Sequence, residues 1–177
     1  MANTNQQNLG KWAALIWALL LYFIIHEGIK MLYALCVGAS VHVSFVSLQY
    51  EAMVDITTMT TFQQCVFWLI GSICTTVAGY IMFFLTDKIL QLHKQWMHVF
   101  NYYLTIVLLV IDPVYLGIVS LMMEGGDMDG IRTVMNEQVV RLVAELVSIA
   151  NVFIIIKYFL PKHREAWKMN KLQGDNK

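Results

Sequence analysis

The chain has 177 residues, of which 58% are hydrophobic and only 14% are charged, and its formal net charge is zero. A soluble domain keeps about a quarter of its residues charged, and a domain of this size exposes much of its surface, so the apolar excess excludes an ordinary soluble domain. The balanced charge gives no indication of a nucleic-acid partner, and three cysteines without a paired spacing argue against a disulfide framework or a sulfur-ligated zinc site. The composition predicts an integral membrane protein whose main partner is the lipid bilayer.

Four apolar stretches follow one another along the chain, and each is long enough to cross a hydrocarbon core about 30 Å thick as a helix of about 20 residues. They cover residues 12–37, 62–85, 99–123 and 139–160. Because helices satisfy their own backbone hydrogen bonds in lipid, the predicted fold is an all-α membrane protein, a bundle of four transmembrane helices. We find no internal repeat or domain boundary, so residues 1–177 are expected to form a single membrane domain that ends in a basic tail at 161–177.

The segments between these stretches differ in charge. Residues 38–61 contain no Lys or Arg, and residues 124–138 carry three acids before their single Arg132. Lys88 and Lys94 lie between the second and third stretches, and the tail is rich in Lys and Arg. Because short loops with many Lys and Arg residues stay in the cytoplasm, this alternation predicts an even number of spans with both termini cytoplasmic. The expected location is the plasma membrane of a prokaryotic cell.

A segment of different character follows the first apolar stretch. Within residues 40–50, Val41, Val43 and Phe45 alternate with small or polar residues, which is the period of a β-strand. A lone strand in lipid would leave its backbone unpaired, so we expect it to pair, for instance with residues 52–59, at the outer membrane face or inside a cavity. The sequence therefore predicts a short membrane-edge β segment after the first helix.

Ionisable side chains interrupt the first apolar stretch at His26, Glu27 and Lys30. Such residues within a span are costly and usually face the interior of a bundle, which makes them candidates for a functional site. His26 and Lys30 are four residues apart and share one helix face, and Glu27 is three residues from Lys30. The simplest interpretation is structural: Glu27 and Lys30 form a buried ion pair, and His26 is hydrogen-bonded beside it.

Asp127 and Asp129 lie in the glycine-containing connection that follows the third stretch. Such a loop is usually solvated, but its acids together with a histidine elsewhere in the bundle could hold a divalent metal ion. His26 lies past the midpoint of its span, in the half of the bundle where this connection opens, so the two groups can meet. By contrast, His98 and His163 lie in basic segments, and we expect them to be solvated at the interface.

The run of residues 26–45 resembles the opening of the site-2 protease family of intramembrane zinc metalloproteases. In that family an HExxH motif on the first core helix is followed by an apolar helical run, a glycine and a membrane-edge β segment; Gly38 stands at the position of the glycine. Residues 128–130, Met-Asp-Gly, resemble the family's LDG motif, which implies that Asp129 is the third zinc ligand. Residues 112–113, Asp-Pro, stand roughly where an Asn-Pro often precedes that motif.

The resemblance covers about residues 20–155, with one departure in its sharpest motif. Lys30 replaces the second histidine of HExxH. An ammonium group has no lone pair for a metal, and its three donors require acceptors instead. The zinc ligands that the resemblance leaves available are His26 and Asp129, with either Asp127 or His42 as a third.

These residues leave three functions open. The first, which we prefer, is a non-catalytic binding or assembly subunit with a site-2-protease-like fold that holds a transmembrane partner in its groove, because Lys30 replaces a metal ligand with an ion-pair partner. The second is an intramembrane zinc metallopeptidase with an altered ligand set, in which Glu27 would be the catalytic general base. The third is a small ion or proton pathway lined by His26, Glu27, Lys30 and Asp112, where Asp112 is otherwise expected to cap a helix broken by the neighbouring proline.

Overall fold

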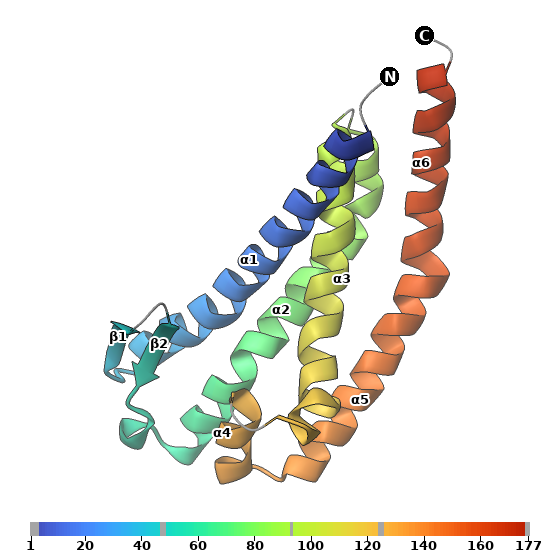
Figure 1. The fold of residues 1–177 in the computed structure, drawn as a ribbon. Coiled ribbons are helices and arrows are strands. Elements are labelled where there is room, and N and C mark those ends of the chain that lie inside the picture. Colours follow the sequence, from blue (N-terminus) through green and yellow to red (C-terminus); the bar gives the residue numbers. More distant parts are fainter. Residues whose placement is uncertain (1–3, 47–48, 93, 124–125, 176–177) are drawn as a thin grey trace.

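The computed structural model describes residues 4–46, 49–92, 94–123 and 126–175, and only the backbone of residues 4–8, 42–46, 49–53 and 169–175. The long elements are α1 (Thr4–Cys36), α2 (Thr61–Leu90), α3 (Gln95–Gly117), α5 (Glu137–Ile154) and α6 (Leu160–Asp175). The short elements are β1 (Val41–Val46), β2 (Gln49–Val54), the 3₁₀ turns η1 (Ile56–Thr58) and η2 (Val119–Leu121), α4 (Asp127–Val134) and the π-helical turn η3 (Ile155–Phe159). Figure 1 shows the helices as a bundle with both chain termini at one end.

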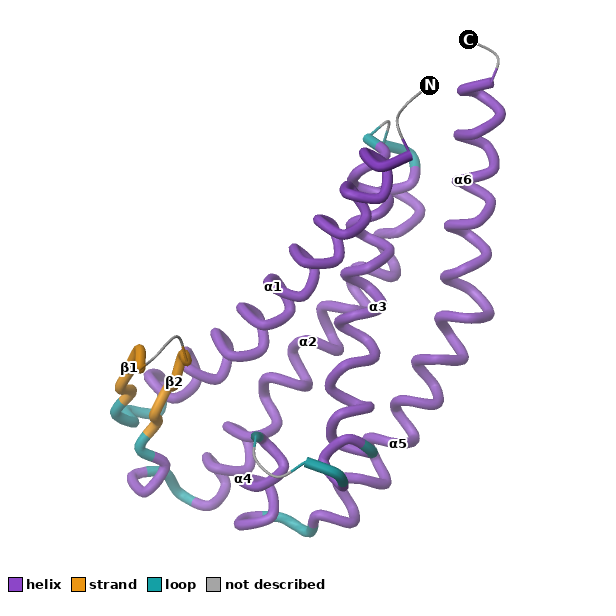
Figure 2. Tube along the Cα trace, in the orientation of Figure 1, coloured by secondary structure: helices purple, strands orange, loops and turns teal. Residues whose placement is uncertain are grey.

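Within the part of the chain that the structure describes, four helical segments are long and apolar enough to cross a membrane, and they cover residues 9–36, 61–90, 95–121 and 137–168. Their number and order confirm the predicted four helices. The largest difference from the predicted bounds is in the last segment, which continues to Lys168 instead of ending at residue 160. Figure 2 shows that the fourth crossing is one continuous helical path through α5, η3 and α6.

The chain reverses direction after α1 at a glycine. Gly38 has φ +80°, a left-handed conformation that L side chains rarely adopt, and the N–H of Ala39 donates to the carbonyl of Ala34 to close the helix. β1 and β2 then pair antiparallel, with Val41 opposite Val54. The hairpin lies at the end of the bundle opposite to the two termini, beside the lower part of α1 (Figure 1). At its base, Ala34, Ala39, Met59 and Phe67 form a buried cluster that joins α1 and the hairpin to α2.

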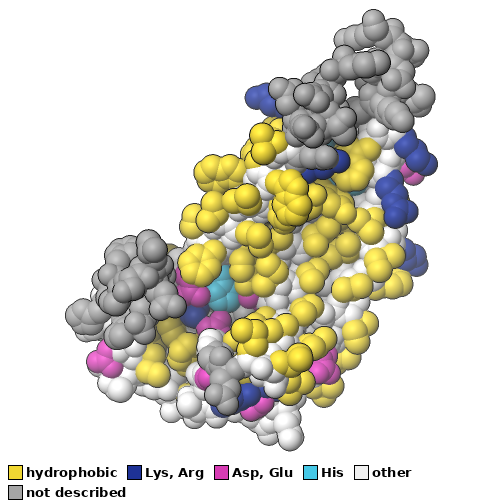
Figure 3. All heavy atoms as spheres, viewed as in Figure 1, with side chains coloured by type: hydrophobic (Ala, Val, Ile, Leu, Met, Phe, Trp, Pro, Cys, Tyr) yellow, Lys and Arg dark blue, Asp and Glu magenta, His cyan; other side chains and the backbone are white. Residues whose placement is uncertain are grey.

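α3 is the centre of the bundle. It packs against α1, α2 and α5, and 56% of its most apolar stretch is buried, compared with 17–28% for the corresponding stretches of the other three crossings. The other helices instead present large apolar side chains outward, and Figure 3 shows hydrophobic side chains spread over much of the face of the bundle that it draws. Such a surface suits lipid, because acyl chains are as apolar as the side chains they meet.

A proline in α3 is matched by a polar side chain from α5. Pro113 has no N–H, so the carbonyl of Leu109, four residues earlier, has no helical partner at that position. The side-chain amide of Asn151 donates to this carbonyl at 2.7 Å, and the amide oxygen of Asn151 accepts from the hydroxyl of Tyr80 at 2.5 Å. Asn151 thus satisfies a carbonyl in the apolar interior and ties α2, α3 and α5 together.

Replacing Asn151 with Leu should therefore destabilise the fold by about 1 kcal/mol, the usual scale for a hydrogen bond between membrane helices. In a Pro113→Ala background the restored N–H of residue 113 can bond to Leu109, so the same replacement should cost less. Reversible unfolding of the four proteins in mixed micelles measures this coupling. Equal costs in the two backgrounds would contradict the compensation.

α6 continues the fourth crossing beyond Pro161 because the helical register shifts just before it. At η3 the N–H of Leu160 donates to the carbonyl of Ile155, a five-residue spacing typical of a π-turn. The continued helix places His163 against α3, where it is fully buried and packs on Tyr102. His98 is buried as well, where its Nε2 lies 2.7 Å from the carbonyl oxygen of Leu92, so the expectation that these two histidines are solvated is wrong. The sequence pattern did not indicate that α6 would pack against α3.

Candidate functional site

A cluster of ionisable side chains lies inside the hairpin end of the bundle, with His26 of α1 at its centre. His26 is only 7% exposed. Its Nδ1 lies 3.3 Å from Oδ2 of Asp112, and its Nε2 lies 2.9 Å from Oδ2 of Asp127. The imidazole therefore bridges a carboxylate on α3 and a carboxylate on α4.

Asp112 collects donors from two further positions. The hydroxyl of Tyr22, one turn before His26 on α1, donates to Oδ1 of Asp112 at 2.5 Å, and the hydroxyl of Thr75 on α2 donates to Oδ2. Asp112 is buried, directly before Pro113 in α3. One carboxylate thus connects α1, α2 and α3, and its charge is met by hydrogen bonds on both oxygens.

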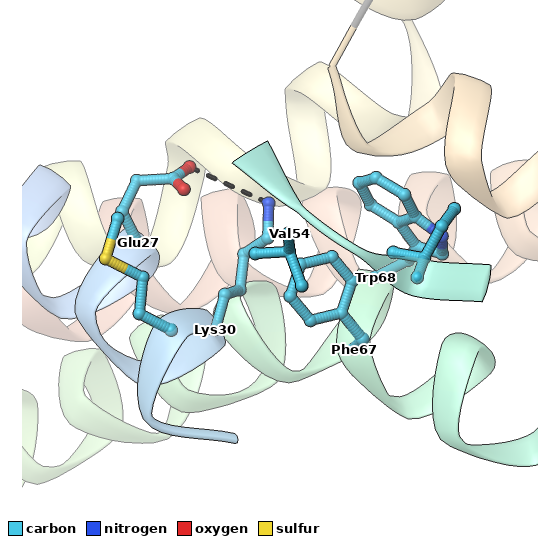
Figure 4. A pocket seen from close by; sticks show the side chains of 7 residues that line it. Glu27, Lys30, Val54, Phe67 and Trp68 are labelled. Atoms are coloured by element: carbon cyan, nitrogen blue, oxygen red, sulfur yellow. Dashed lines mark ion pairs between the residues drawn. The ribbon is translucent and has the colours of Figure 1, made fainter. Parts of the chain in front are cut away.

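Lys30 lies one turn beyond His26 and is also 7% exposed. Its ammonium group donates to Oδ1 of Asp127 and lies 3.7 Å from Oε1 of Glu27. The same group lies 5.4 Å from the ring centre of Phe67 and 5.3 Å from that of Trp68, within the range of cation–π attraction. Figure 4 shows the ion pair of Lys30 with Glu27 and the two aromatic side chains beside it.

Asp127 begins α4 and contacts both His26 and Lys30 of α1. Burial raises the pKa of the Asp127 carboxyl, whereas the hydrogen bond from His26 and the charge of Lys30 lower it. The lowering effects together outweigh burial, so the pKa lies below its ordinary value. A lowered pKa in the folded state stabilises the fold above the carboxyl's ordinary pKa, and this contribution is lost as the pH falls through the lowered value. Asp127 is therefore an ionised anchor between α4 and α1.

The close approach of α2 to this cluster depends on a glycine. A Cβ atom at Gly71 would lie 2.9 Å from Nε2 of His26, so the imidazole occupies the space that any other residue at position 71 would need. Gly71 is buried and stands one helical turn before Thr75, which bonds to Asp112. α2 thus lets the imidazole of His26 pack directly against its backbone at Gly71, and it contributes the hydroxyl of Thr75 as a donor to Asp112.

The structure brings together five of the residues that the sequence indicated: His26, Glu27, Lys30, Asp112 and Asp127. It places Asp129 elsewhere, because the carboxylate of Asp129 pairs with Nη1 of Arg132 at 2.9 Å on the outer side of α4. The side chain of His42 lies outside the described residues. The expected pair of Glu27 and Lys30 is present, but Lys30 bonds more closely to Asp127.

Sequence reasoning missed two members of the cluster, Tyr22 and Thr75. Tyr22 had a signal, because it precedes His26 by four residues and so shares its helix face. Thr75 had none: a threonine in an apolar helix usually bonds to its own backbone, as Thr75 also does at Gly71.

The residues of this cluster do not fit a zinc ion in the arrangement observed. Zinc requires ligand atoms with free lone pairs, but both nitrogens of His26 face carboxylate oxygens and the ammonium of Lys30 lies on the carboxylate that would be the second ligand. Among the described residues, no three His, Cys, Asp or Glu side chains are grouped so that they could hold a metal. The positive charge in this site is supplied by the chain's own side chains.

The arrangement can hold α1, α2, α3 and α4 in one register, and it can carry a proton on an imidazole between two carboxylates. Both capabilities come from residues of four separate elements that meet near the hairpin. No protein-family model matches the chain. No curated protein and no solved structure is significantly similar to it.

Proposed function

We propose that this chain is a non-catalytic membrane protein with a site-2-protease-like fold that binds or assembles a partner within the bilayer. The observation that supports this function best is the contact between Lys30 and Asp127, which puts a fixed cation where a metallopeptidase needs a ligand and an open position for water. Around it, Tyr22 and Thr75 satisfy Asp112, so the polar centre is closed by hydrogen bonds. Such a centre is suited to support a binding surface.

The proposal includes an orientation in the membrane, with both termini in the cytoplasm and the hairpin at the outer membrane edge. The end that carries the termini is rich in basic residues, among them Lys11, Lys88, Lys94, Lys162, Arg164 and Lys168. The opposite end carries the hairpin, α4 and acids such as Asp55 and Asp129. This asymmetry agrees with retention of positively charged segments on the cytoplasmic side.

Cysteine labelling tests the orientation in a background in which Cys36, Cys65 and Cys74 are replaced by serine. Met122→Cys, which lies 86% exposed at the hairpin end, should react with an impermeant maleimide added to intact cells. Lys168→Cys, in the exposed part of α6, should react only after the membrane is permeabilised. The reverse labelling pattern would place the hairpin inside the cell.

Zinc content tests the non-catalytic assignment. The purified natural chain should hold only substoichiometric zinc, because Lys30 occupies Asp127. Lys30→His should instead bind about one zinc ion per chain, since His26, the new histidine and Asp127 then supply three ligands. Adding Asp127→Ala to this variant should abolish the uptake, whereas adding Asp129→Ala should preserve it, and elemental analysis by mass spectrometry distinguishes the variants.

Stoichiometric zinc in the natural chain, lost on His26→Ala, would instead favour the alternative of a zinc metallopeptidase with an altered ligand set. The other alternative, a proton or ion pathway, has its own support in the imidazole that bridges Asp112 and Asp127. Metal-free protein that accelerates proton flux in liposomes, with the flux lost on His26→Leu, would favour that pathway over the binding function.

A further inference from the structure

The charges of the cluster leave one carboxylate without a matching cation. Both nitrogens of His26 face carboxylate oxygens, one of Asp112 and one of Asp127. Even with His26 counted as a cation, His26 and Lys30 balance only the two carboxylates to which they are bonded, Asp112 and Asp127. Glu27 is the third carboxylate, and it lies at the longer distances of 3.7 Å from Lys30 and 3.8 Å from His26.

This surplus carboxylate lines a cavity at the surface. The cavity has a volume of about 370 Å³ and lies between α1, α2 and the end of β2. Apart from Glu27 and Lys30 its walls are apolar or aromatic, and they include Met31, Ile56, Phe67 and Trp68. The side chain of Glu27 is 29% exposed, so an occupant can reach it. The side chain of Lys30 is only 8% exposed; its ammonium group is bonded to Asp127, and the rings of Phe67 and Trp68 lie beside it (Figure 4).

We propose that this cavity binds a cationic group on an apolar stem, and that its occupant is a Lys or Arg side chain from a transmembrane segment of the partner. This inference rests on the proposed binding function and names the chemistry of the partner. The size of the cavity is at the lower end of the range for ligand sites, so it admits one long side chain and not a helix. The stem would lie against Phe67 and Trp68, and the charged end would pair with Glu27.

The charge of the site makes the cation the favoured occupant. An anion would approach Glu27 and Asp127 and would find Lys30 already bound to both. A basic side chain near the end of a transmembrane helix also needs a counter-ion when it leaves water, because an unpaired charge in the membrane is costly. Glu27 at the mouth of an aromatic cavity supplies that counter-ion together with a surface for the methylene groups.

Titration calorimetry on the full chain in nanodiscs tests the charge preference with three probes of equal length: hexylammonium, hexanol and hexanoate. Hexylammonium should bind about tenfold more tightly than hexanol, a difference of about 1.4 kcal/mol, and hexanoate should bind most weakly. Glu27→Gln should remove this preference. Asp129→Asn, which removes an acid bound to Arg132 on the outer side of α4, should keep it.

A second variant keeps the test decisive if Glu27→Gln does not fold. Ile56→Trp fills the cavity without changing any charge, and it should abolish hexylammonium binding. A preference for hexanoate, an unchanged preference in Glu27→Gln or unchanged binding in Ile56→Trp would overturn the proposal. Metal-free protein with no preference among the probes would refute this inference and leave the proposed function intact, whereas zinc in the natural chain would refute the function itself.

A synthetic transmembrane peptide then identifies the source of the cation. A peptide with a single lysine near one end should bind to the chain in the same nanodiscs about tenfold more tightly than the same peptide with norleucine, again about 1.4 kcal/mol. Glu27→Gln should make the two peptides equivalent. If hexylammonium binds but the two peptides do not differ, the cavity is a site for a free amine, and the assignment to a partner helix is overturned.

Discussion

Lys30→Met should be strongly destabilising, by about 3–5 kcal/mol, because it leaves the buried carboxylate of Asp127 without its ammonium partner. Lys30 is 7% exposed and meets Asp127 away from bulk water, so no solvent replaces the lost ammonium at low cost. Reversible unfolding in mixed micelles, followed by circular dichroism, measures the change.

Two controls separate this effect from the loss of any ion pair. Lys30→Met combined with Asp127→Asn removes both charges, and it should cost clearly less than Lys30→Met alone. Lys162→Met breaks an exposed pair with Asp87, whose atoms lie 2.7 Å apart, and it should cost less than about 1 kcal/mol. A double variant as unstable as Lys30→Met would show that the side-chain volume of Lys30 matters and its charge does not.

Gly130→Ala should also destabilise the fold, by about 3 kcal/mol, the upper part of the range for overpacked sites. A Cβ atom at Gly130 would lie 2.0 Å from Cε2 of Trp68, so the indole or the whole of α4 must move. Because Asp127 belongs to the same helix, that movement would also weaken its contact with Lys30. Micellar unfolding gives the loss of stability, and cavity binding of hexylammonium should weaken in parallel because Trp68 forms a wall.

Gly28→Ala is the matched control for this substitution. Gly28 is exposed on α1, and a Cβ atom there would meet no heavy atom within 4 Å. The replacement should be neutral or slightly stabilising, since alanine favours a helix over glycine by up to about 1 kcal/mol. Equal destabilisation by the two alanines would mean that the contact between α4 and Trp68 does not limit the space at Gly130.

The four crossings could be predicted because their signal is local. Each is a run of apolar residues, and the need to satisfy the backbone in lipid leaves little choice of structure. The extension past residue 160 could not be read in the same way. A proline ordinarily ends a helix, and the register shift at η3 that accommodates Pro161 depends on how α6 packs against α3.

The candidate site was predictable on α1 and uncertain on α4. The spacing of His26 and Lys30 places them on one face of any helix. Asp127 and Asp129 are about 200° apart around a helix, so one must face inward when the other faces out, and the choice depends on where α4 begins. In the structure α4 begins at Asp127 and buries it, whereas the motif resemblance had indicated Asp129.

The long sequence separation within the charged cluster has a consequence for how the chain is synthesised. Lys30 and Asp127 are 97 residues apart, and a ribosome at 5–20 residues per second needs about 5–20 s to cover that distance. When helix α1 leaves the translocon, Glu27 is therefore the acid within reach of Lys30, because Asp112 and Asp127 have not yet been made. The contacts of His26 and Lys30 with Asp112 and Asp127 form only after α3 and α4 emerge, so the polar face of α1 stays incompletely paired for several seconds.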